Sequence, residues 1–254
     1  QSPSTGSSDL LDYPRPAVQI DYYLPEDAEQ PVRLDILDGE GKVVNTLLSS
    51  KDGKLEKEII SDMNLSSAVY LAARELKATK GLHRFRWDME HPGPWHSSDR
   101  RRYRGGPRVA PGTCTVRLSV GENVQEQSFE LMLDPRSEAS GTTVADVKAQ
   151  EALALQMVEL LSEVRKTQQT LQKKHKTLSG KEELSEKEQQ ELAKVEKALK
   201  ELETPQGTYM QPMLESQVNY LYYIVTGADQ APGNDARQRY TELKQRFENL
   251  LSSD

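Results

Sequence analysis

The first half of the chain alternates apolar and polar residues in short runs, which is the pattern of β-strands with one buried face. Residues 38–41 (Asp-Gly-Glu-Gly) tolerate positive φ and predict a hairpin turn. In one strand, Phe85 and Trp87 are expected to be core anchors, with Leu82 on the opposite face. Short strands with few helices between them favour an antiparallel sandwich. The predicted strands cover residues 18–24, 32–37, 42–47, 82–88, 113–120 and 127–133.

The apolar spacing changes to three and four residues after Asp134, as in amphipathic helices. Thr143 and Ser185 are candidate helix caps, and Ser179-Gly180 is expected to end a first helix long enough for a coiled-coil arm. Four helices with short connections predict an antiparallel bundle with a long helical hairpin. The expected inner stripes are Val147, Ala154, Met157, Leu161, Val164, Leu171 and Leu178 with polar Gln150, Gln168 and His175; Leu192, Val195, Leu199 and Leu202; Leu214, Val218, Leu221, Tyr222 and Val225; and Tyr240, Leu243, Phe247, Leu250 and Leu251.

These patterns predict an α+β protein of two domains. Residues 1–15, rich in Ser, Pro and Gly, are expected to be a flexible linker. An immunoglobulin-like β-sandwich is expected over 16–136, and a four-helix antiparallel bundle over 137–254. The charged stretch 49–80 is interpreted as an insertion or long loop, with a short helix near 67–77.

Composition narrows the classes of function. The 254 residues carry a formal charge of -7, whereas a nucleic-acid binder normally has a basic surplus, so nucleic acid is not an expected partner. No apolar run approaches the length of about 18 residues that a membrane span needs, and residues 1–12 lack the apolar segment of a signal peptide. The single cysteine, Cys114, cannot form an intrachain disulfide and is expected to be buried in a strand.

Candidate catalytic and metal-binding residues do not form a convincing set. His91 and His96, with Asp99 nearby, are interpreted as part of a surface loop, because the intervening prolines forbid the helix of a zinc motif. His175 is expected to be a polar member of a helix seam. A phosphate-binding loop and a serine-nucleophile turn are both missing from the sequence. We therefore predict no catalytic residue, metal or cofactor within these residues.

A loop rich in arginine and aromatic residues is the candidate ligand site. Guanidinium groups bind carboxylates and stack on aromatic rings, which suggests an anion or sugar ligand. The alternatives are a solvated loop, or a loop that docks on a neighbouring acidic domain. The candidate ligand-binding residues are Trp95, Arg100, Arg101, Arg102, Tyr103 and Arg104, with Arg108 nearby.

Five stretches resemble, in order, the segment that follows the β-propeller in large bacterial sortilin-like and BNR-repeat glycosyl hydrolase-like proteins: PAVQIDYYLP, VRLDILDGEGKVVNTL, GLHRFRWDMEHPGP, GGPRVAPGTCTVRLSV and QSFELMLDPR. That segment is an immunoglobulin-like domain of the flagellar hook-capping type. The stretch LESQVNYLYYIVTGADQAPGNDARQRYTELKQRF is similar to the C-terminal bundle of the same proteins. Trp87-Asp88 and Pro111-Gly112-Thr113 are the most specific elements, whereas Cys114 stands where the family usually has an aromatic residue.

The resemblance implies an exported protein that is periplasmic, on the cell surface or secreted. It implies a non-catalytic accessory module that packs against its own propeller domain or binds another protein. A carbohydrate-binding module that uses the loop from Trp95 to Arg108 is the alternative, with a glycan as partner. A further alternative is part of a glycoside hydrolase whose site lies mainly in a missing propeller.

Overall fold

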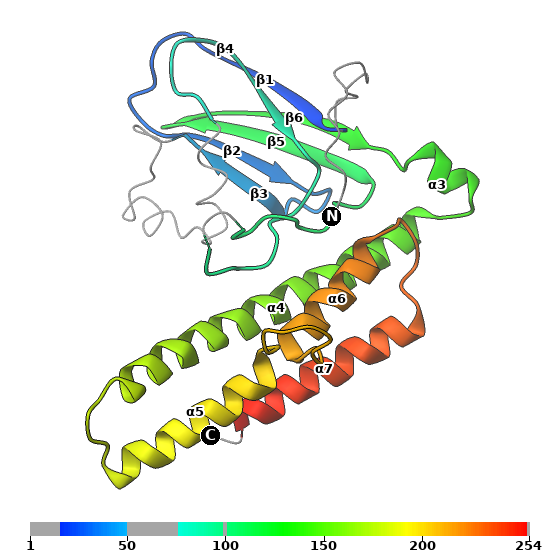
Figure 1. The fold of residues 1–254 in the computed structure, drawn as a ribbon. Helices are drawn as coiled ribbons and strands as arrows, with labels where there is room; N and C mark the ends of the chain where they lie inside the picture. Colours follow the sequence, from blue (N-terminus) through cyan, green and yellow to red (C-terminus); the bar gives the residue numbers. More distant parts are fainter. Residues whose placement is uncertain (1–15, 50–75, 99–100, 253–254) are drawn as a thin grey trace, which may run out of the picture.

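The computed structural model describes residues 16–49, 76–98 and 101–252. Within these ranges the chain forms six strands followed by five helices, with the strands gathered over one end of the longest helix (Figure 1). The predicted linker 1–15 lies outside the described residues. The α+β class and the antiparallel pairing are confirmed.

The strands form two antiparallel sheets. β1 (Val18–Leu24) pairs with β4 (Gly81–Trp87) in the smaller sheet. The larger sheet has the order β3-β2-β5-β6, and consists of β2 (Val32–Leu37), β3 (Val43–Leu48), β5 (Gly112–Val120) and β6 (Asn123–Leu131). The expected hairpin joins β2 to β3, with Gly41 at a φ of 79°. The two sheets therefore follow the predicted strands closely.

Both ends of the last strand were predicted wrongly. β6 begins at Asn123, four positions before the predicted start, and ends at Leu131. Its first six residues are all exposed, so they show no alternation of buried and exposed side chains. The strand is held there by backbone pairing with β5, which a hydrophobic pattern does not reveal.

The two sheets share one apolar core. Phe85 is 7% exposed and Trp87 is 1% exposed, whereas Leu82 on the same strand is 73% exposed, which confirms the predicted faces of β4. The rings of Trp87 and of Phe129 in the opposite sheet form a T-shaped pair with a centroid distance of 6.3 Å. The remaining core residues come from both sheets and include Ile20, Tyr22, Leu24, Val32, Leu34, Ile36, Val44 and Leu47.

The segment between β3 and β4 departs from the sequence-based expectation. Ser49 and Leu76 form a parallel β-bridge, and the backbone of Lys77 both donates to and accepts from the Tyr22 hydroxyl. Leu76 and Lys77 are therefore not helical, which corrects the end of the predicted helix over 67–77. The rest of that helix lies outside the described residues.

Cys114 lies in β5 and is buried, as predicted. Burial raises the pKa of its thiol to about 11. At mildly alkaline pH the folded protein should therefore react with a disulfide reagent about a hundredfold more slowly than an ordinary cysteine, since only the thiolate attacks. Reaction with Ellman's reagent, with and without guanidinium chloride, measures the difference. Fast labelling of the folded chain would contradict the buried position.

The helical region contains a short helix and four longer ones. They are α3 (Pro135–Ala139), α4 (Val144–Ser179), α5 (Glu186–Leu202), α6 (Leu214–Thr226) and α7 (Asn234–Ser252). The predicted caps are correct, because Thr143 and Ser185 each form a capping box with an acidic residue three positions later. α3 was not predicted, although Asp134 followed by proline is a recognisable cap and first turn.

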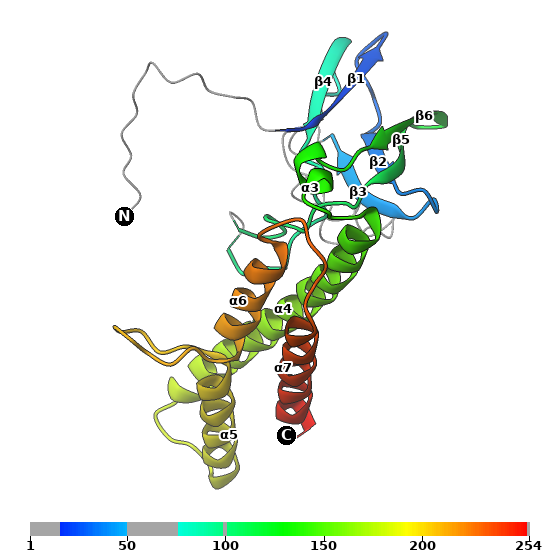
Figure 2. The same ribbon diagram turned by 90° about the vertical axis from the view of Figure 1, so that its right-hand side faces the viewer.

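α4 is the central helix of this region. α5 returns along its C-terminal part, and α6 and α7 lie beside its other end (Figures 1 and 2). The buried residues of α6 are the five that were predicted. On α4, Leu153 and Leu160 are also buried, because a helix covered on several sides needs a wider apolar stripe than one seam.

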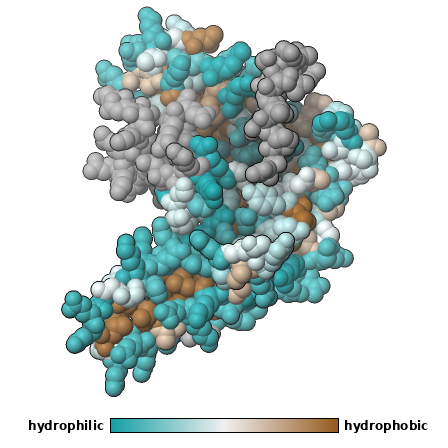
Figure 3. Space-filling model, in the orientation of Figure 1, coloured by the Kyte–Doolittle hydropathy of each residue, from teal (hydrophilic) through white to brown (hydrophobic). Residues whose placement is uncertain are grey.

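The apolar core of the helices is separate from the core of the sheets. It is formed by residues of α4, α5, α6 and α7, among them Met157, Leu161, Leu202, Val218 and Phe247. The surface in Figure 3 is mostly hydrophilic, with hydrophobic side chains gathered along the α4–α5 hairpin. In residues 16–49, 76–98 and 101–252, no helix combines the length and apolar character needed to cross a bilayer.

Candidate functional site

The loop over residues 91–108, which connects β4 to β5, lies against the helices. His91 Nε2 is 2.6 Å from Glu151 Oε1 of α4, and both side chains are largely buried. Further along α4, the Ser162 hydroxyl accepts a hydrogen bond of 2.9 Å from the Trp95 backbone N–H. The Tyr222 hydroxyl of α6 donates to the Gly105 carbonyl at 2.7 Å. The interpretation of His91 as a surface-loop residue was therefore wrong.

Close backbone contacts shape this 91–108 loop. Gly93 N–H donates to the Tyr103 carbonyl at 2.9 Å, which brings the two arms of the loop together. A Cβ at Gly93 would lie 2.2 Å from the Arg104 carbonyl oxygen, and one at Gly106 would lie 1.7 Å from that of His91. Both positions therefore require glycine, and the two arms of the loop, residues 91–98 and 101–108, lie close together.

The structure divides the predicted ligand residues between two places. Trp95 is half-buried, with the Arg102 guanidinium carbon 5.7 Å from the centroid of its ring. Arg102 also donates to the His96 and Ser97 carbonyls at 2.9 and 3.0 Å, so it holds the loop together. Tyr103 and Arg104 instead line a cavity of about 1280 Å³ that faces the sheets. Arg101 is exposed, and Arg100 lies outside the described residues.

The histidine cluster does not form a metal site in the part of the chain that the structure describes. His96 Nδ1 accepts a hydrogen bond of 2.9 Å from the Ser98 N–H. Burial lowers the pKa of His96, and the nearby Arg165 and Arg101 lower it further. The lowered pKa favours the neutral form of the His96 imidazole within the loop. Asp99, the third residue of the suggested cluster, lies outside the described residues.

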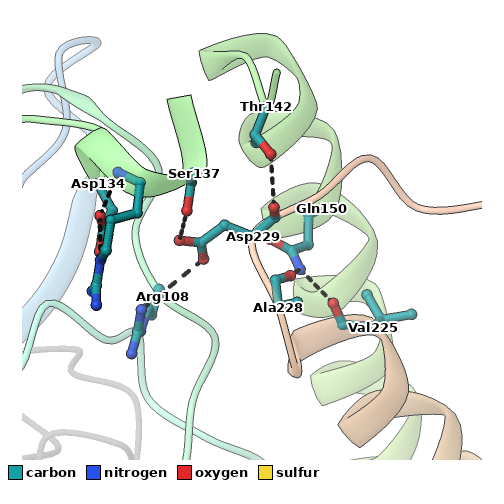
Figure 4. A network of polar contacts seen from close by, with 9 residues as sticks. Arg108, Asp134, Ser137, Thr142, Gln150, Val225, Ala228 and Asp229 are labelled. Atoms are coloured by element: carbon teal, nitrogen blue, oxygen red, sulfur yellow. Dashed lines mark hydrogen bonds and ion pairs between the residues drawn. The ribbon is translucent and has the colours of Figure 1, made fainter. Parts of the chain in front are cut away.

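A second polar network, which the sequence did not predict, centres on Asp229 between α6 and α7 (Figure 4). Its carboxylate accepts a hydrogen bond of 3.2 Å from the Ser137 hydroxyl of α3. Its backbone carbonyl accepts one of 3.0 Å from Thr142. Arg108 Nη1, from the 91–108 loop, is 4.0 Å from Asp229 Oδ1. Asp229 thus connects the helix turn, α3 and the β region, although nothing in its local sequence marks it.

Gln150 supports the same turn from inside the helices. Its side-chain amide donates to the Val225 and Ala228 carbonyls at the end of α6, and the residue is 8% exposed. Gln150 was expected as a polar member of the α4 seam, and the two carbonyls explain why a polar residue is kept there.

Replacing Gln150 with alanine should lower the free energy of unfolding by about 1–3 kcal/mol, because two carbonyls near the core lose their donor. Gln156 on the same helix is exposed, so its replacement with alanine is the control and should change little. Urea denaturation followed by circular dichroism measures both. Equal effects of the two substitutions would contradict the buried role of Gln150.

A smaller cleft of about 650 Å³ opens beside Asp229. Its walls come from α3, the C-terminal end of α6 and the end of the 91–108 loop. Hydrogen bonds and charge from Arg136 hold the pKa of the Asp134 carboxyl at about 2, so this group stays ionised at any physiological pH. The charged and hydroxyl side chains of the lining are Glu90, Arg108, Asp134, Arg136, Ser137, Ser140, Thr226 and Asp229, with the rings of Tyr222 and Tyr223.

No family model matches the chain, and no curated protein or solved structure shows significant similarity to it.

Proposed function

We propose that this chain is a non-catalytic accessory module of a larger exported propeller protein, where it packs against the propeller or binds a protein partner. The observation that carries the proposal is the docked 91–108 loop. The contacts of His91, Trp95 and Gly105 with α4 and α6 join the strands and the helices into one unit. A unit of this kind presents one continuous surface, which suits a structural or interaction role.

The strand pairing supports an immunoglobulin-like sandwich as the first part of this module. Such sandwiches pack two antiparallel sheets over one core, with consecutive strands divided between the sheets. Here the sheets β1-β4 and β3-β2-β5-β6 share one core that includes Trp87. The common core of α4, α5, α6 and α7 supports a four-helix antiparallel bundle as the second part.

The contacts of the 91–108 loop support a structural role for this loop more than they support a sugar-binding site at Trp95. An aromatic platform for a sugar needs an open ring face, but Trp95 is half-buried and Arg102 lies against its ring. Arg102 itself is engaged with two backbone carbonyls of the loop. The Trp95 and Arg102 side chains therefore make contacts within the loop that do not depend on a ligand.

The coding sequence upstream of Gln1 gives the first test of the proposal. Propeller repeats before Gln1 would support it, and a signal peptide directly before Gln1 would contradict it. If the repeats are present, the propeller and this chain should be produced separately and mixed. Co-elution in size-exclusion chromatography is expected for a packing module. Separate elution, with no binding in calorimetric titration, would contradict packing against the propeller.

A further inference from the structure

We propose that the cleft beside Asp229 is a binding site for a neutral saccharide, with the exposed ring of Tyr223 as its stacking surface. Trp95 does not line this cleft, although Arg108 at the end of the 91–108 loop does, and the inference does not rest on the proposed accessory function. Its volume of about 650 Å³ falls within the range of roughly 300–1,000 Å³ that small-molecule sites occupy. One or two sugar rings fit in that space.

Tyr223 is the aromatic wall of the cleft. Its side chain is 65% exposed, although the preceding residue, Tyr222, is 4% exposed. The two rings lie with centroids 6.1 Å apart, and the Tyr222 hydroxyl is fixed to the Gly105 carbonyl. Tyr223 therefore lies on a turn of α6 whose position is fixed by the buried, hydrogen-bonded Tyr222. A tyrosine with few rotatable bonds provides contact area at low entropic cost.

Three other side chains that line the cleft can bind sugar hydroxyls. Arg108 reaches the site from the 91–108 loop, Ser137 from α3, and Asp229 from the α6–α7 turn (Figure 4). Arg108 is 69% exposed, and its ion pair with Asp229 is long at 4.0 Å, so most of its five donors remain available. The Asp229 carboxylate uses one oxygen for Ser137 and can accept further hydrogen bonds.

The charges of the lining favour a neutral ligand. Three carboxylates, Glu90, Asp134 and Asp229, line the cleft with two guanidinium groups, Arg108 and Arg136. Asp134 and Arg136 are already paired with each other through two hydrogen bonds, of 3.0 and 2.6 Å. An anion would be repelled by Glu90 and Asp229, and a cation would be repelled by Arg108, while either ion would also have to lose its own hydration. A polyhydroxy ligand can donate to the carboxylates and accept from the guanidinium groups in the same pose. The mixed signs therefore favour a neutral sugar over a charged one.

Titration of the whole chain with defined disaccharides tests the site. The neutral probes are cellobiose, maltose and N,N′-diacetylchitobiose, and the charged probes are digalacturonic acid and the β-1,4-linked disaccharide of glucosamine. Saturation-transfer NMR and calorimetry should detect binding of at least one neutral probe, and weaker or no binding of the charged probes. The Tyr223→Ala variant should lose about tenfold or more in affinity, and Arg108→Ala should also weaken binding.

Tyr220 supplies the matched control. It lies one turn earlier on α6, is 69% exposed and does not line the cleft, so Tyr220→Ala should leave the affinity unchanged. Because both tyrosines are exposed, neither substitution should change the melting temperature. The proposal is overturned if no neutral probe binds, if a charged probe binds more tightly, or if Tyr223→Ala has no larger effect than Tyr220→Ala.

Discussion

Replacing Trp87 with alanine should lower the free energy of unfolding of the strand region by about 3–5 kcal/mol. Trp87 is 1% exposed and fills the space between the two sheets, where its ring meets Phe129. Its indole N–H also donates to the Glu90 carbonyl at 3.2 Å, so the substitution removes a hydrogen bond as well as a large apolar side chain. Because a domain is stabilised by only about 5–15 kcal/mol, this loss should bring the sheets close to unfolding.

Leu82 on the same strand is the control for Trp87. It is 73% exposed on the outer face of β4, so Leu82→Ala should change the free energy of unfolding by less than about 0.5 kcal/mol. Urea denaturation followed by circular dichroism measures both variants. A small effect of Trp87→Ala, or an equal effect of Leu82→Ala, would contradict the position of the core.

The second large effect is expected in the helices. Leu161 is fully buried in α4 within the core shared with α5, α6 and α7. Leu161→Ala should lower the free energy of unfolding of the helical region by about 2–5 kcal/mol, because the lost contacts leave a cavity that the neighbouring helices cannot fill.

Lys166 on the same helix is the control for Leu161. It is exposed, and Lys166→Ala keeps a strong helix former, so its effect should be near zero. Thermal unfolding at the helical circular dichroism band compares the two variants. Because the sheets have a separate core, the strand region should keep its own transition in Leu161→Ala. The contacts of the 91–108 loop hold the two regions in a fixed arrangement in the folded chain, but they do not merge the two cores. Loss of both regions in a single transition would contradict separate unfolding of the two cores.

The elements with strong periodicity could be predicted from the sequence. The alternation of apolar and polar residues identified β4. The helical spacing of apolar residues identified the buried face of α6, which consists of Leu214, Val218, Leu221, Tyr222 and Val225. The start of β6 could not be found in this way, because its first residues are exposed on the surface of the sheet. The domain boundaries and the resemblance to propeller-associated proteins stay predictions.

The junction could be predicted only in part. The arginine-rich loop stood out in the sequence, but its partners Glu151, Ser162 and Tyr222 lie 60 to 117 positions away. Single contacts over such separations leave no periodic signal. Asp229 was missed for the same reason. Its contacts are Ser137 of α3 and Arg108 of the 91–108 loop, which both lie far from it in the sequence.

The central claim is that the 91–108 loop fixes the strands and the helices as one unit. Pulsed electron-spin resonance measures it directly, with spin labels on cysteines introduced at Glu122 beside β6 and Lys187 in α5, both exposed positions. Cys114 is buried and should not take a label. One narrow distance distribution is expected, and it should broaden when Glu151 and Ser162 are both replaced with alanine. A broad distribution in the labelled chain without those two alanine substitutions would contradict the claim.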